Sequence, residues 1–140
     1  MKQVISNHVI NSNEINAISY KIIGAAINVH RVIGMGLTIN AYKACLLEEL
    51  DTTGLHYELD VEFPLFYKSK FVDASVKISL LIENQIMIEI FAADDIYEED
   101  MFRVLNYLKQ ADLKLGLIIN FNRKQLKGDA IRRVVNGTIE

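Results

Sequence analysis

Glu89 is the residue whose surroundings most clearly suggest chemistry, because it is a carboxylate within the apolar run of residues 85–91. Side chains alternate between the two faces of a β-strand, so Met87, Glu89 and Phe91 share one face and three isoleucines share the other. Burying a carboxylate without a partner costs free energy. The sequence therefore predicts a charged or hydrogen-bonding partner for Glu89.

The preceding strand adds little to such a site. Residues 72–82 also have a strand pattern, and a tight hairpin at Glu83-Asn84 would join them to residues 85–91. Lys77, Ser79 and Leu81 share a face, which the hairpin places beside that of Glu89. Because Mg²⁺ prefers carboxylate oxygens, this setting would suit a metal-dependent hydrolase if more acids converged on it. The two strands do not supply them.

Other residue types that carry chemistry are scattered. His8, His30 and His56 lie far apart without metal-ligand spacing, which argues against a zinc site. Cys45 is the only cysteine, so there is no intrachain disulfide, and we interpret it as a buried apolar thiol. The Gly-x-Gly at residues 34–36 follows a helix rather than a strand, unlike a dinucleotide-binding turn. The strand aromatics are interpreted as core or sheet-face residues rather than a base-stacking platform: Tyr57, Phe63, Phe66, Tyr67 and Phe71.

Hydrophobic periodicity predicts the elements that position these residues. Two helices come first, one starting at Ser12 or Asn13 and ending at residues 34–36, the other capped by Thr38 and ending near residue 54. Extended segments, a third helix, a buried strand and a weak last element follow, at residues 56–62, 63–67, 72–82, 85–91, 98–111, 114–120 and 131–135. This order predicts an α/β fold of the α+β sandwich kind, a mixed sheet flanked by helices.

Length and composition indicate one globular domain. The chain has 140 residues, 51% of them apolar and 24% charged, with one proline. We expect a tail at residues 1–12, a domain at 13–122, and a basic extension at 123–140 that packs on the same domain. No signal peptide or membrane span is apparent, so we expect a cytoplasmic protein without a membrane partner.

Charge is distributed unevenly along the chain, although the net charge is only −3. Residues 83–100 hold seven acids and no base, whereas residues 103–133 hold eight bases and two acids. Solvated surfaces are one interpretation; complementary surfaces in a homo-oligomer and a local nucleic-acid patch are the others. The residues that would contact nucleic acid or a partner are Arg123, Lys124, Lys127, Arg132 and Arg133.

Several blocks resemble the GxxExxY proteins, small members of the PD-(D/E)XK nuclease superfamily. The resemblance spans about Asn13 to Gly137 and rests on the order and spacing of its matching stretches. These are residues 18–30, 34–37, Tyr42, Leu46, 105–109, 113–121 and 133–137. The resemblance implies an αβββαβ core, and active members would use acids to hold Mg²⁺ and a lysine to assist the attack of water on a phosphodiester.

Carried over position by position, the family's polar residues are mostly replaced in this chain. Its name-giving glutamate falls on Ile39, its strand aspartate on Ser79, the lysine of its E-x-K pair on Phe91, and its helix glutamine on Arg103. Only the glutamate of the E-x-K pair remains, as Glu89. We hypothesise that Ile39 and Phe91 fill the former polar cavity, and that Arg103 pairs with Glu89 in place of a metal.

Three functions remain open on this basis. The first is a catalytically inactive nuclease-fold protein without a cofactor, which acts as a scaffold by assembling with itself or a partner. The second is nucleic-acid binding without cleavage. The third is a Mg²⁺-dependent nuclease whose Glu89 recruits relocated ligands from among Asp73, Glu83, Asp94 and Asp95.

Overall fold

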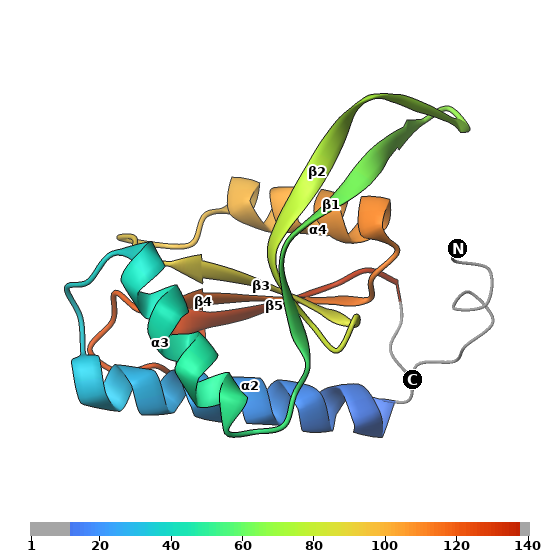
Figure 1. Ribbon diagram of the computed structural model, residues 1–140. Coiled ribbons are helices and arrows are strands. Elements are labelled where there is room, and N and C mark those ends of the chain that lie inside the picture. The colour runs from blue at the N-terminus through green and yellow to red at the C-terminus, as the bar shows by residue number, and fades with distance from the viewer. Residues whose placement is uncertain (1–11, 138–140) are drawn as a thin grey trace.

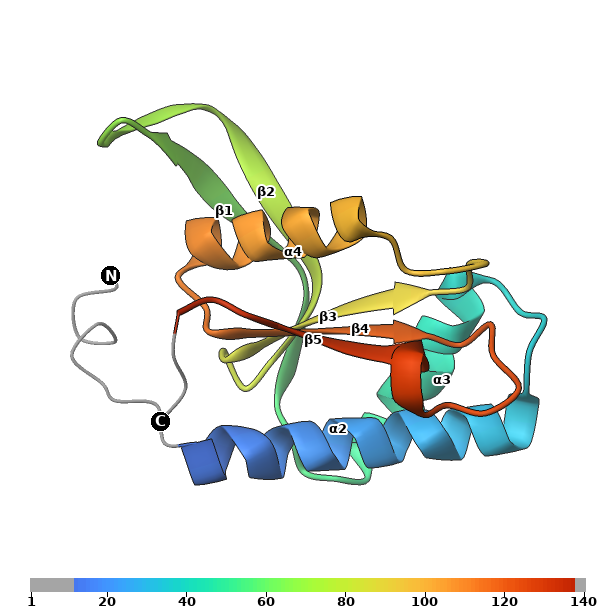
Figure 2. The same ribbon diagram turned by 180° about the vertical axis from the view of Figure 1, so that it is seen from behind.

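A computed structural model describes residues 12–137 and places one five-stranded sheet between two layers of helices (Figures 1 and 2). The helices are α2 (Ser12–Ile33), α3 (Ile39–Asp51) and α4 (Glu98–Ala111), with a short 3₁₀ turn, η1, at Gly128–Ala130. The strands are β1 (Tyr57–Tyr67), β2 (Lys70–Ile82), β3 (Ile86–Phe91), β4 (Leu115–Asn120) and β5 (Ile131–Val135). The predicted fold class and element order are confirmed.

The sheet is mixed, in the order β1-β2-β3-β4-β5. Only β3 and β4 run parallel, and the other neighbours are antiparallel. A parallel pair needs a crossover, and α4 provides it on one face of the sheet. Helices α2 and α3 cover the other face (Figure 1). The predicted tail residues 1–11 and the last three residues, 138–140, lie outside the described part of the chain.

Each face of the sheet has its own apolar core. Ile88, Leu117 and Ile119 pack with the buried faces of α2 and α3. Met87 and Ile118 are sequence neighbours of these residues and point to the opposite face of the sheet. There they pack with Val104 and Leu108 of α4. The fully buried pattern of β4 agrees with its position inside the sheet, covered on both sides.

Two elements differ from the sequence expectation. The extended segments 56–62 and 63–67 form a single edge strand, β1, whose register with β2 shifts between Pro64 and Phe66. An edge tolerates a proline because its N–H side does not need a partner. Residues 131–135, expected as a weak element, form a full sheet strand paired with β4. Residues 131–135 of the predicted extension therefore supply one strand of the sheet.

The strand aromatics were predicted to be core or sheet-face residues, and for three of the five the core alternative is wrong. Phe66, Tyr67 and Phe71 are exposed, whereas Tyr57 and Phe63 are partly buried. The reason is that β2 pairs with β3 only through Leu80–Ile82, so the distal part of the β1–β2 hairpin extends beyond the sheet (Figure 1). Among the described residues, no helix is long and apolar enough to span a membrane.

Gly116 of β4 allows α4 to pack closely on the sheet. A Cβ at this position would lie 2.7 Å from Val104 Cγ1, closer than van der Waals contact permits. Val104 is β-branched and cannot easily turn away within a helix. We expect Gly116→Ala to lower the free energy of unfolding, measured in urea, by about 1–3 kcal/mol.

Gly24→Ala is the matched control for this measurement. Nothing lies within 4 Å of a Cβ built on Gly24, which is exposed in the middle of α2. Because alanine favours helix more than glycine does, this variant should gain about 0.5–1 kcal/mol. Equal effects of the two substitutions would contradict the close approach of α4 to Gly116.

Candidate functional site

Glu89 is the one carboxylate kept among the positions that the resemblance maps onto this chain. It lies on β3 and faces α4. Its side chain is 19% exposed, and its Oε1 accepts a hydrogen bond of 2.7 Å from an Nη of Arg103. The predicted pairing of Arg103 with Glu89 is confirmed. The ion pair also explains how an apolar strand tolerates a carboxylate, because the guanidinium supplies both a counter-charge and a donor.

Arg103 makes two further contacts. It donates from its other Nη to Asp100 Oδ1 at 3.0 Å, one helical turn earlier, and its guanidinium carbon lies 5.8 Å from the centroid of the Phe91 ring. Such a distance permits a cation–π contact. Burial lowers the pKa of the Arg103 guanidinium, but the hydrogen bonds to Glu89 and Asp100 and the negative charges of these two carboxylates together raise it by more, so the net pKa lies above its ordinary value. The guanidinium is therefore a permanent cation between two carboxylates.

Ser79 does not share this face, contrary to the expectation from strand alternation. Its hydroxyl accepts a hydrogen bond of 2.7 Å from Lys43 Nζ on α3, across the sheet from Arg103. The residues on either side of it belong to different cores, Ile78 to the α4 side and Leu80 to the α3 side. Regular alternation is thus broken at Ser79, close to Asp60 of β1, which has a left-handed φ of 52°.

Ile39 does not fill a cavity, so this part of the hypothesis is also wrong. Its side chain is 47% exposed at the first residue of α3. Phe91 is partly buried and packs against the α4-side core, as the hypothesis requires. The position on α3 that the resemblance maps to a glutamate is therefore an exposed apolar one here rather than part of a packed interior.

The loop before α3 is held by residues whose role is structural. Gly36 has φ 109°, a conformation that disfavours a side chain. Thr38 caps α3 by accepting from the Ala41 N–H at 3.2 Å. The fully buried Tyr42 donates its hydroxyl proton to the Gly34 carbonyl at 2.6 Å and stacks on Phe121 with ring centroids 4.4 Å apart.

The residues around Glu89 do not fit a divalent cation. In residues 12–137, no three His, Cys, Asp or Glu side chains come together as metal ligands. Of the proposed relocated ligands, Asp94 accepts from the Tyr97 hydroxyl, Asp95 pairs with Arg123, and Glu83 accepts from the His56 N–H. Each acid is engaged elsewhere, and Asp73 is exposed on the hairpin.

The predicted basic contact residues differ in their surroundings, and Arg132 and Arg133, as neighbours in β5, point to opposite faces of the sheet. Arg123 pairs with Asp95 at 3.2 Å and with Asp129 at 3.8 Å, while its carbonyl contacts the buried His30 ring. Arg133 lies within hydrogen-bond distance of Asn16 and Ser19 on α2. Arg132 directly precedes Arg133 in β5. Lys124 and Lys127 are exposed in the loop before β5.

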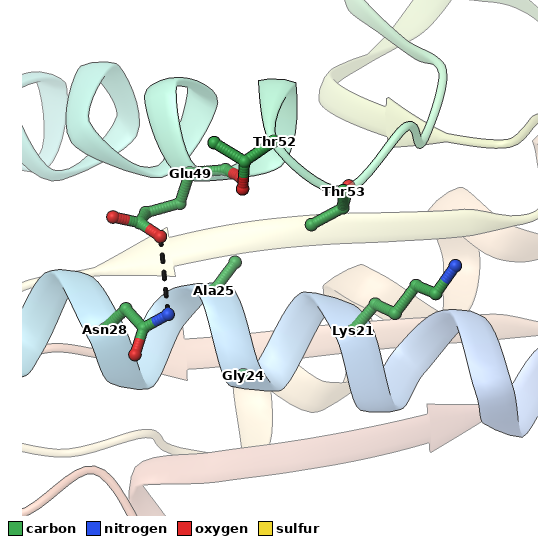
Figure 3. Close-up of a pocket in the computed structure, with 7 residues that line it drawn as sticks. All are labelled: Lys21, Gly24, Ala25, Asn28, Glu49, Thr52 and Thr53. Carbon is green, nitrogen blue, oxygen red and sulfur yellow. Dashed lines mark hydrogen bonds between the residues drawn. The ribbon is translucent and has the colours of Figure 1, made fainter.

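A shallow groove of about 230 Å³ lies between α2 and α3, away from Glu89 (Figure 3). Asn28 donates to Glu49 across it at 3.4 Å, and Figure 3 shows Lys21 extending from α2 at its other end. The remaining lining residues are Gly24, Ala25, Thr52 and Thr53. Its two charged lining residues, Lys21 and Glu49, lie at opposite ends of the groove (Figure 3). Cys45, expected to be fully buried, is only partly so and packs against the α2–α3 core.

Comparison with protein families agrees with this architecture. Residues 16–134 match the family model of the PD-(D/E)XK nuclease superfamily. The chain therefore belongs to the PD-(D/E)XK nuclease superfamily. In the same comparisons, no curated protein and no solved structure matched.

Sequence reasoning missed two residues of the site. Asp100 lies three residues before Arg103 in a predicted helix, and that spacing alone indicates a helical ion pair. Lys43 had no comparable signal, because it is 36 residues away from Ser79 and the break in strand alternation is not visible in the sequence.

The ion pair makes a stability prediction. Arg103→Gln should lower the free energy of unfolding by about 1–2 kcal/mol, since it leaves Glu89 with one poorer donor in a largely apolar setting. The double variant, Glu89→Gln with Arg103→Gln, should lose less free energy of unfolding than the two single variants lose in sum. The double-mutant cycle should give a coupling energy of about 1 kcal/mol. The exposed Lys109→Gln on the same helix is the control and should change stability by about 0.5 kcal/mol or less. Additive single effects would show that the pair contributes nothing.

Proposed function

We propose that this chain belongs to the GxxExxY group of the superfamily, has lost metal-dependent cleavage, and acts as a self-assembling scaffold. The proposal of inactivity rests on the Arg103–Glu89 ion pair. The Arg103 guanidinium, which is covalently part of the chain, pairs with the carboxylate that would otherwise anchor a metal. Unlike a dissolved ion, it cannot diffuse away when the Mg²⁺ concentration rises.

Charge balance at the five mapped positions supports this proposal. The family pattern has three carboxylates and one lysine there, which leaves two negative charges for a divalent cation to neutralise. Here Glu89 and Arg103 cancel, and Ile39, Ser79 and Phe91 are neutral. The replacements together remove the excess negative charge that makes a hydrated dication bind. A single lost residue would not have this effect.

The GxxExxY assignment is supported by what remains at the motif. Its first and last positions are Gly36 and Tyr42, which fix the loop conformation and close the loop onto the core. Its middle position, Ile39, is 47% exposed. Positions that hold the scaffold are retained, whereas positions that carry the chemistry are replaced.

The proposal of assembly rests on exposed apolar side chains. Val32, Phe71 and Phe102 are exposed by 79%, 62% and 58% respectively. Phe71 also contacts the exposed Phe66 ring, with centroids 4.4 Å apart, and neighbouring exposed apolar side chains are typical of interaction sites. Dispersal of the basic residues makes a nucleic-acid surface over residues 123–133 a weaker alternative.

Loss of metal chemistry gives a direct prediction. We expect no cleavage of single- or double-stranded DNA or RNA with Mg²⁺ or Mn²⁺, and no Mn²⁺ binding by calorimetry, because Glu89 is already neutralised. Glu89→Ala should give the same results as the unmodified chain. Cleavage or Mn²⁺ binding that disappears in Glu89→Ala would refute the proposed inactivity.

Assembly is tested by light scattering. At low salt and micromolar concentration, we expect a mass larger than that of the 15.9-kDa chain. If charged surfaces contribute to the contact, the mass should decrease as salt screens them. A monomer at every salt and protein concentration would contradict the scaffold proposal, whatever the result of the cleavage assay.

A further inference from the structure

The distal end of the β1–β2 hairpin is an exposed aromatic and basic surface. Phe66, Tyr67 and Phe71 are 48%, 58% and 62% exposed, and the Phe66 and Phe71 rings contact each other with centroids 4.4 Å apart. Lys68 and Lys70 lie within and beside the turn that joins the strands. We call residues 66–71 the hairpin end. Each aromatic side chain can bury about 150–250 Å², so together they can supply a substantial part of a contact.

The hairpin end is held in place. The Phe66 N–H donates to Gln110 Oε1 of α4 at 3.0 Å, and Glu62 faces Lys77 across the two strands. Lys68 and Ser69 both have left-handed φ values, as a tight hairpin turn requires. A surface that is ordered before binding loses less conformational entropy on binding.

The opposite end of the molecule carries a second exposed apolar surface. Residues 32–39 contain no charged side chain, and their apolar members are exposed by 79%, 38%, 47%, 41% and 47% at Val32, Ile33, Met35, Leu37 and Ile39. Both ribbon views place the β3–α4 loop beside the start of α3, far from the hairpin end (Figures 1 and 2).

This second surface is bordered by acids. Asp94 lies in the β3–α4 loop, and Glu98 and Glu99 are in the first turn of α4, with the half-exposed Tyr97 between them and Asp94. We call residues 32–39 together with Asp94, Glu98 and Glu99 the loop end. Within residues 12–137, none of these three acids forms an ion pair, and neither does Lys68 or Lys70.

We propose that the hairpin end of one copy of this chain docks on the loop end of a second copy, a head-to-tail contact that rests on the proposed self-assembly. Aromatic side chains would cover the apolar loop, while Lys68 and Lys70 would meet the unpaired acids. Because the two surfaces differ and lie at opposite ends, each bound copy presents a free surface to the next. Such a heterologous contact generates rings or filaments rather than a closed dimer.

Charge favours this arrangement over a symmetric one. Two hairpin ends facing each other would bring lysine against lysine, and two loop ends would bring carboxylate against carboxylate. Like charges across an interface oppose association. A single-stranded nucleic acid also fits aromatic and basic side chains, but it would leave the loop end uncovered and would approach a chain of net charge −3.

Complementary variants test the proposal. The hairpin variant is Lys68→Glu with Phe71→Ser, and the loop variant is Val32→Ser with Met35→Ser. Every substituted side chain is exposed, and circular dichroism verifies folding. Each variant alone should be monomeric by light scattering, because each lacks one of the two surfaces. An equimolar mixture should form a heterodimer of twice the 15.9-kDa mass, joined through the two intact surfaces.

Two further measurements make the test specific. Tyr20→Ser, at an 81% exposed position on α2 outside both ends, should assemble like the unmodified chain. Reversing both charges with Lys68→Glu and Lys70→Glu should raise the dissociation constant of assembly at least tenfold. Adding Glu98→Lys and Glu99→Lys in the same chain should restore assembly.

The outcomes separate the two proposals. If the unmodified chain is monomeric throughout, the scaffold proposal fails and the head-to-tail contact fails with it. If the unmodified chain assembles and the single variants keep its mass, or their mixture stays monomeric, self-assembly stands and the head-to-tail contact is refuted. If the hairpin variant keeps its mass but loses binding to an oligothymidylate, the hairpin end is a nucleic-acid surface, and the head-to-tail contact is again refuted.

Discussion

A carboxylate in the middle of an apolar strand must be neutralised, and this constraint governs the site. Glu89 meets it with Arg103, which reaches from α4 to β3 and is itself held by Asp100. In a metal-dependent relative, an exchangeable dication would supply the positive charge. Here the helix supplies it, so the charge balance of the interior does not depend on metal. The ion pair also joins the crossover helix to the strand from which the crossover starts.

The sequence predicts most of the fold because local signals and packing agree. The bounds of α4 are those expected from its apolar stripe, and the cap at Thr38 was evident from residue type. Arg103 was paired with Glu89 because both fall on positions of the site implied by the resemblance and they carry opposite charge. The periodicity of helices and strands determines which side of an element a residue occupies, provided the element is regular.

The errors occur where regularity ends. Ser79 was expected beside Glu89, but the strand changes face there, and its hydroxyl meets Lys43 instead. Phe66 and Phe71 are aromatic residues in extended segments, a residue type that favours core or sheet-face positions, yet they lie beyond the end of the neighbouring strand. Where a strand twists, or continues past its partner, depends on contacts between distant residues. No local pattern contains that information.

Under the proposed function, Ile39 would connect the loss of a site with the gain of a surface. An isoleucine offers no oxygen ligand, and its 47% exposure adds apolar area to a loop that also exposes Leu37 and Met35. Gly36, with its left-handed φ, and Tyr42, which donates to the Gly34 carbonyl, hold the backbone of that loop. In the proposed scaffold, the isoleucine at position 39 would both withhold a metal ligand and enlarge an apolar contact surface. This double effect gives a physical reason why a nuclease scaffold would keep its fold after losing its chemistry.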